Sequence, residues 1–101
     1  MFEALDGPSA QLKVSLDTVT VKEVKVGALA LDDRKVITLQ PTGKIKVYFG
    51  SGGAAPLAAV VAANGLDHFK DAKETYEAGD KQKVYILSAV GTVDVIIVER
   101  A

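Results

Sequence analysis

The sequence predicts a mainly β fold, a two-layer antiparallel β-sandwich or roll of about seven to eight strands, with at most one short helix, at residues 57–63. Apolar and polar residues alternate over 12–16 and 44–49, which is the pattern of a strand with one buried face. Turn-forming Gly, Pro, Asn and Asp residues separate such segments, as expected of an all-β domain. Residues 11–101 are predicted to form this one domain, and residues 1–10, which have no periodicity, an N-terminal arm.

The composition is that of a globular domain with a full core. Hydrophobic residues make up 49% of the 101 residues and Cys is absent, so disulfides and thiolate metal sites are excluded. Twelve basic and thirteen acidic residues are mixed along the chain and leave a net charge of −1, which does not favour bulk attraction to DNA or to an anionic membrane. A mean hydropathy of +0.20 is high for so small a chain and predicts a partner surface or self-association.

No segment resembles a secretory signal or a membrane span. The first residues carry acidic side chains where a signal would carry basic ones. The longest apolar run, 54–63, is interrupted by Pro56 and is about half the length that a span requires. We therefore expect a soluble protein that is made in the cytoplasm and has no membrane partner.

The strands up to residue 80 follow from alternation and turns. Leu12, Val14 and Leu16 predict a first strand that Val19 and Val21 continue, and a shift of phase at 22–23 predicts a bulge or a break there. Further strands are predicted at 34–40, 44–50 and 72–77, with turns at 32–33, 41–43 and 78–80.

The closing stretch, 81–100, predicts a β-hairpin with a short break at 90–91. Val93, Val95 and Ile97 point to one side of its second strand, and Ile96 and Val98 to the other. Both faces of that strand are apolar. The pattern therefore predicts a strand that is covered on both sides and lies at the centre of the fold.

Residues 57–63 fit two structures. Pro56 before them and Asn64 and Gly65 after them are typical of a two-turn helix. The same residues fit a strand that an Asn-Gly turn ends. A helix of about eight residues is marginal and the surroundings are β, so a strand is slightly favoured.

Groups that carry chemistry are few. His68 is the one histidine, and with Asp67 and Asp71 it lacks the third or fourth ligand of a tight metal site, so we expect a solvated loop histidine. Asp32 and Asp33 are typical turn formers, and no serine has a Gly-x-Ser-x-Gly setting. The sequence therefore predicts no enzyme activity, no cofactor and no metal.

Lysine and tyrosine recur with strand spacing in two places. The six residues, here the Lys/Tyr set, are Lys44, Lys46, Tyr48, Lys81, Lys83 and Tyr85. If their two strands are neighbours, they form a basic, aromatic face of the kind that holds single-stranded nucleic acid. An ordinary solvated sheet face is the alternative, and the net charge and the lack of an RNA-recognition signature favour it. Nucleic acid is therefore not the expected partner.

Four apolar residues near turns or on the arm form a candidate interface, namely Phe2, Leu5, Leu29 and Leu31. Phe2 and Leu5 either pack on the domain's own core or reach a neighbouring subunit. The partner expected for such a surface is a second copy of the chain, in a dimer or trimer.

Short motifs give the chain a resemblance to a known group of proteins. They are Val-Lys-Val-Gly-Ala at 24–28, Leu31, 33–35, Val-Tyr-Phe-Gly at 47–50, 77–79, 84–85, Gly-Thr-Val-Asp-Val at 91–95, and Glu99. From about residue 19 to the end, this pattern resembles the small accessory virion proteins of tailed bacteriophages. The Ala-rich 57–63 departs from the more polar residues expected there.

The resemblance implies a β-sandwich or roll that decorates or stabilises a capsid shell as a homo-oligomer. It further implies that the partner is the major capsid protein or another virion protein, and that the protein is made in the host cytoplasm and ends in the virion. A tail or baseplate component is the alternative within this class. A carbohydrate-binding or adhesion module is the leading alternative outside it, although the chain has no Trp and only three Tyr.

Overall fold

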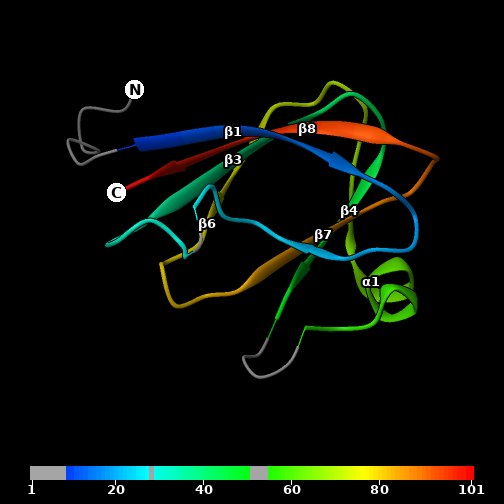
Figure 1. The fold of residues 1–101 in the computed structure, drawn as a ribbon, viewed down its shortest axis with the longest axis horizontal. Helices are drawn as coiled ribbons and strands as arrows, with labels where there is room; N and C mark the ends of the chain where they lie inside the picture. Colours follow the sequence, from blue (N-terminus) through cyan, green and yellow to red (C-terminus); the bar gives the residue numbers. More distant parts are fainter. Residues whose placement is uncertain (1–8, 28, 51–54) are drawn as a thin grey trace.

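Two four-stranded antiparallel sheets pack face to face in this protein (Figure 1). The computed structural model describes residues 9–27, 29–50 and 55–101. Sheet A has the strand order β1-β8-β3-β6 and sheet B the order β2-β7-β4-β5. The strands are β1 Ser9–Leu16, β2 Lys22–Glu23, β3 Val36–Pro41, β4 Ile45–Phe49, β5 Leu66–His68, β6 Glu74–Glu77, β7 Val84–Ser88 and β8 Val93–Arg100, and the helix α1 is Ala58–Asn64. The predicted two-layer β fold is confirmed, and Ser9 and Ala10, assigned to the arm, belong to β1.

The strand order is that of a jelly roll. β1 pairs with β8, β2 with β7, β3 with β6 and β4 with β5, and every pair is antiparallel. The chain is thus a long two-stranded ribbon that turns back between β4 and β5. Two further antiparallel pairs, β3 with β8 and β4 with β7, close the rolled ribbon into two sheets.

The predicted hairpin at 81–100 is wrong, because β7 lies in sheet B and β8 in sheet A. The turn between them is held at Ser88, whose Oγ lies 2.6 Å from the carbonyl oxygen of Gly91 and accepts the N–H of Val90 at 3.1 Å. Gly91 has a φ of +46°, which favours glycine. Each strand was recognisable from composition, but its partners lie far away in the sequence.

The core lies between the sheets, and β8 contributes one face to it. Val93, Val95 and Ile97 are buried there, as predicted. Ile96, on the other face, is 36% exposed, and Val98 is only partly buried. The prediction that β8 is covered on both faces is therefore wrong.

The strand covered on both faces is β7, whose five residues are all buried. Val84 and Ile86 belong to the core, so Tyr85 and Leu87 point to the outer face of sheet B. There α1 packs against β4 and β7 and buries Val61 completely. The strand favoured for 57–63 is wrong and the alternative short helix is confirmed, because packing on the sheet stabilises a helix that is marginal alone. No helix in the described residues is long and apolar enough to cross a membrane.

Strand β1 ends at Leu16 instead of continuing to Val21. Asp17 Oδ1 accepts the backbone N–H groups of Val19 at 3.0 Å and Thr20 at 2.7 Å, and this turn leads the chain from sheet A to sheet B. These bonds, that of Val19 first, hold the pKa of Asp17 below its usual value. The break predicted at 22–23 is misplaced, since those residues form β2.

Candidate interaction surfaces

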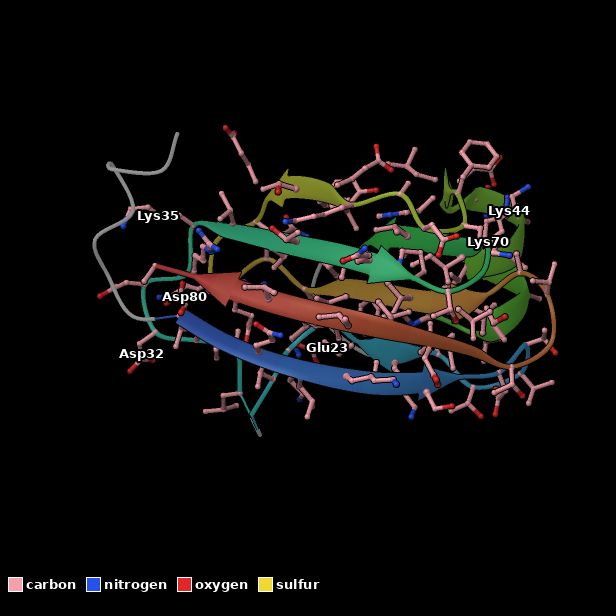
Figure 2. The ribbon with its side chains drawn as sticks, turned by 90° about the horizontal axis from the view of Figure 1, so that it is seen from above. Glu23, Asp32, Lys35, Lys44, Lys70 and Asp80 are labelled. Carbon is pink, nitrogen blue, oxygen red and sulfur yellow. The ribbon has the colours of Figure 1, made fainter. Side chains whose placement is uncertain are left out.

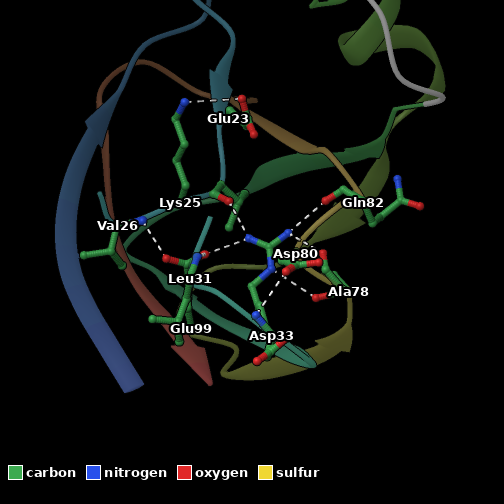
Figure 3. A network of polar contacts seen from close by, with 12 residues as sticks. Glu23, Lys25, Val26, Leu31, Asp33, Ala78, Asp80, Gln82 and Glu99 are labelled. Atoms are coloured by element: carbon green, nitrogen blue, oxygen red, sulfur yellow. Dashed lines mark hydrogen bonds and ion pairs between the residues drawn. The ribbon is translucent and has the colours of Figure 1, made fainter. Parts of the chain in front are cut away.

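A buried ion pair fixes one end of the sandwich (Figure 3). Arg34 Nη1 donates to Glu99 Oε2 at 2.8 Å, and each side chain is 1% exposed. The other N–H groups of the guanidinium donate to the backbone carbonyls of Val24, Ala78, Gly79 and Gln82 at 2.8–3.0 Å. Every donor of this buried cation is therefore satisfied, which offsets the free energy of removing it from water.

The carboxylate of this pair also holds the backbone at Val26 and Leu31. Glu99 accepts the N–H of Val26 at 2.8 Å and that of Leu31 at 3.2 Å. The predicted turn at 32–33 is confirmed, with φ at +58° for Asp33 and its N–H donated to Asp80 Oδ2 at 3.0 Å. Glu99 continues the alternation of Val93, Val95 and Ile97 and so lies on the buried side of β8. A charged residue at such a position was the one sequence signal for this ion pair.

One of the predicted interface residues, Leu29, lies in the sequence between these two contacts. Leu29 is 81% exposed, whereas Leu31, whose N–H is bound to Glu99, is partly buried. Phe2 and Leu5 lie outside the described residues. A groove of about 320 Å³ beside Leu29 is lined by Glu23, Lys25, Leu29, Ala30, Asp32, Asp80, Lys81 and Lys83. Its three lysines face three carboxylates, so the groove is not basic.

The Lys/Tyr set lies partly on neighbouring strands. β4 and β7 are paired, and Tyr48 lies directly opposite Tyr85. Lys81 and Lys83 precede β7, so their predicted place on that strand is wrong. Tyr85 is only 4% exposed, and this burial prevents a base from stacking on its ring.

The lysines of β4 and its preceding turn already have an anionic partner. Lys46 donates a hydrogen bond to Asp67, and Lys44 Nζ lies 3.7 Å from the same carboxylate. The bond from Lys46, together with the charge of Lys44, holds the pKa of Asp67 below its usual value. The described members of the set therefore do not form a free basic, aromatic face.

His68 is fully buried, so the predicted solvated loop histidine is wrong. Pairing of β5 with β4 places it opposite Ile45, on the core face. Its Nδ1 lies 2.9 Å from the Tyr76 hydroxyl and its Nε2 2.6 Å from the Ala72 carbonyl oxygen. Burial, and to a lesser degree Glu74, raises the pKa of Tyr76.

His68 and Tyr76 join two sheet edges, because His68 is on β5 of sheet B and Tyr76 on β6 of sheet A. Both ring nitrogens of the histidine are engaged, which explains how it is buried without an unsatisfied polar atom. In the described residues, no three His, Asp or Glu side chains gather where they could hold a metal ion.

The outer face of sheet A is open, because no described element packs over it. Figure 2 shows its strands side by side, in the order β1, β8, β3 and β6. A shallow groove of about 240 Å³ crosses it, lined by Gln11, Val36, Thr38, Gln40, Lys73, Thr75, Ile96, Val98 and Arg100. Val36, Ile96 and Val98 lie among the polar side chains of Thr and Gln residues and the cationic side chains of Lys73 and Arg100, and the lining contains no aromatic ring. This face has the apolar centre and polar surroundings of a protein-docking surface.

Comparison with known proteins supports the fold. No protein-family model and no curated protein matches the chain. Among solved structures, a de novo designed double-stranded β-helix is similar to 91% of this chain and 99% of its own, with 12% identity and a TM-score of 0.55. This likeness agrees with the jelly-roll strand order and bears on the fold alone.

Two further structures are more distant. A structure of the disulfide-linked pili that form Bacillus endospore appendages matches 94% of this chain and 88% of its own, with 17% identity and a TM-score of 0.42. The Tobacco streak virus coat protein dimer matches 90% of this chain and 86% of its own, with 9% identity and a TM-score of 0.36. At these TM-scores, neither likeness supports a fold or a role for this chain.

Proposed function

We propose that this protein is a structural module that binds the outside of a phage head shell as a small homo-oligomer and contributes interface area instead of chemistry. The observation that carries this proposal is the open outer face of sheet A, with Val36, Ile96 and Val98 set among polar side chains. The resemblance of its short motifs to accessory virion proteins of tailed phages supports the same role.

The fold suits a docking role because its surfaces are held in place. The Arg34–Glu99 pair fixes the backbone at Val26 and Leu31, and the His68–Tyr76 contact joins the edges β5 and β6. Because such a surface is already ordered, little conformational entropy is lost when a partner binds to it. A module of this kind can bind the many identical sites of a symmetric shell and stabilise the shell without a ligand pocket.

The molecule has enough surface for two contacts, one to the shell and one to a second copy. Its accessible surface is 5810 Å², about seven times the roughly 800 Å² that each partner gives to a standard interface. The face of sheet A is assigned to the shell protein. Its apolar residues Val36, Ile96 and Val98 favour a partner surface with an apolar centre.

The groove on sheet A also bears on the carbohydrate-binding alternative. Sugar rings are bound largely by stacking on aromatic side chains, and none lines this groove. A panel of glycans should therefore give no binding to the purified protein in calorimetry. Saturable binding that Thr38→Ala or Thr75→Ala weakens would favour the carbohydrate alternative.

A mass-spectrometric inventory of purified particles tests the proposal directly. Hundreds of copies per particle are expected if the protein covers the head, and a handful would place it at the neck or baseplate. Hundreds of copies that remain on tails separated from heads would favour the tail alternative. Absence of the protein from purified virions would overturn the proposal.

The role of the N-terminal arm is tested by deleting residues 1–8. The described domain begins at Ser9, so thermal unfolding should change little while recovery on particles falls, because Phe2 and Leu5 are lost. Full occupancy by the truncated protein would show that the arm is not an anchor and leave the sheet A face to act alone.

A further inference from the structure

Strand β1 has a long open edge. One side of Ser9–Leu16 pairs with β8 along its whole length, and no described residue pairs with the other side. The other edge strands of the described sheets are short, with four residues in β6, three in β5 and two in β2. An unpaired edge presents N–H and C=O groups that another strand can bind, and short edges limit this. Figure 2 shows β1 at the border of sheet A, beside β8.

An apolar side chain lies uncovered on this edge. Leu12 is opposite Ile97, on the face that turns toward the core, yet Leu12 is 42% exposed while Ile97 is 1% exposed. Val14, on the same face, is only partly buried. On the opposite face of the strand, Lys13 carries the one charge, and its side chain is 66% exposed.

We infer that β1 pairs antiparallel with β1 of a second copy, across a twofold axis that passes at Leu12. This inference deepens the proposed function, on which it rests for the expectation of self-association, by naming the surface between the copies. A strand of eight residues finds an edge of equal length only in another β1, because the other described edges are at most four residues long.

Symmetry and charge select the register. A twofold axis perpendicular to the sheet keeps core-facing side chains on one side, so Leu12 meets Leu12, Gln11 meets Lys13 and Val14 meets Ala10 of the second copy. Residues 9–15 then all pair. An axis at Lys13 would place two lysines directly opposite each other, which is destabilising.

The resulting dimer has a consequence for docking. Sheet A of one copy continues into sheet A of the other, so the two open outer faces form one surface. The Leu12 side chains cover each other at the centre, as expected of an isologous interface with an apolar middle. A shell whose binding sites are related by a matching twofold axis would contact the sheet A grooves of both copies at once.

Cysteine cross-linking tests the register, because the natural chain contains no Cys. Directly opposite residues of antiparallel strands have Cα atoms about 4.5 to 5.5 Å apart, within the range that a disulfide spans. Leu12→Cys should therefore form disulfide-linked dimers on mild oxidation. Lys13→Cys should not link to itself, because diagonal neighbours lie about 7 to 8 Å apart, whereas a mixture of Gln11→Cys and Lys13→Cys should yield linked heterodimers. Leu66→Cys is the control, since Leu66 is 56% exposed on β5, an edge of the other sheet.

Sedimentation of the purified protein tests the dimer without cross-linking. We expect a species of twice the mass of the chain at micromolar concentration. Leu12→Lys places two like charges opposite each other at the axis, so its dimer should have a dissociation constant about tenfold or more larger. Leu66→Lys should remain dimeric, and circular dichroism should show that both variants are folded. A monomeric wild-type protein, self-linking of Lys13→Cys in place of Leu12→Cys, or equal dissociation of Leu66→Lys would overturn the inference.

These outcomes are separable from those of the proposed function. A dimer that is absent from particles would overturn the virion role and leave the β1 interface standing. A monomer that decorates particles would overturn the β1 interface and the expected homo-oligomer, and leave the virion role standing.

Discussion

The two sheets of this jelly roll differ in what lies on their outer faces. On sheet B, α1 packs over β4 and β7, and Tyr85, Leu87 and Val61 are buried beneath or within it. On sheet A, no described element covers β8, and Ile96 remains 36% exposed. Apolar residues on the outer face of sheet B are covered and stabilise the fold, whereas those on the outer face of sheet A stay exposed and form the docking face that we propose.

The largest expected effect comes from removing the buried Arg34 guanidinium, which binds Glu99 of sheet A and the carbonyls of Val24 and Gln82 next to β2 and β7 of sheet B. Arg34→Ala would leave Glu99 of β8 buried without its cation, and should lower the free energy of unfolding by about 3 to 5 kcal/mol. Lys35→Ala, at the exposed neighbouring position, should change it by less than about 0.5 kcal/mol. Denaturant unfolding measures both. Equal effects of the two substitutions would mean that the buried pair does not hold the sandwich together.

The next effect compares the two outer faces directly. Leu87→Ala, under α1, should lower the free energy of unfolding by about 2 to 4 kcal/mol, as should Ile97→Ala in the central core. Ile96→Ala, on the open face of sheet A, should lower it by less than about 1 kcal/mol. Urea midpoints at constant m-value give these differences. A Leu87→Ala effect below about half a kcal/mol would refute the view that the outer face of sheet B is part of the core.

The smallest effect concerns pH at the exposed edge of sheet B. The hydrogen bond from Lys46 lowers the pKa of Asp67 in the folded state, so this contact stabilises the fold above the ordinary carboxyl pKa of 3.8 and is lost as pH falls through the lowered value. Asp67→Asn should therefore decrease the melting temperature by a few degrees at most at pH 7, and this deficit should vanish in acid, once Asp67 is protonated in the folded state. Thermal scans across this range measure the difference. A deficit that persists in acid would show that charge is not its cause.

Periodicity located the strands better than it located their partners. The alternation of Val93, Val95 and Ile97 correctly gave the core face of β8, because side-chain direction is a local property of a strand. Pairing is not local in a jelly roll, so the proximity of β7 and β8 in the sequence pointed to a hairpin that does not form. Of the apolar strands β7 and β8, only β7 is covered on both faces, because α1 packs over it. The helical structure of α1 was itself decided by this packing on the sheet, which is not a local property of the sequence.

Candidate surfaces were predicted less well than the core. Leu29 is exposed as a binding residue should be, but the lysines and tyrosines with strand spacing differ in environment, since Tyr85 is buried and Lys46 is bound to Asp67. Burial of His68 followed from a three-residue strand that has no sequence signature. The sequence did not show that β1 is an edge strand either, because that depends on which strands pair with it in the fold.

The central claim, that sheet A carries the docking face while sheet B does not, is tested most directly by occupancy on purified particles. Ile96→Lys places a charge on the open face of sheet A, and Leu57→Lys places the same charge at the start of α1, where Leu57 is 75% exposed. Both variants should keep the wild-type melting temperature within a few degrees. We expect Ile96→Lys to reduce the copies per particle by about tenfold or more, since a charge at the centre of an interface is buried without a partner, and Leu57→Lys to leave occupancy unchanged. Full occupancy by Ile96→Lys would contradict the account.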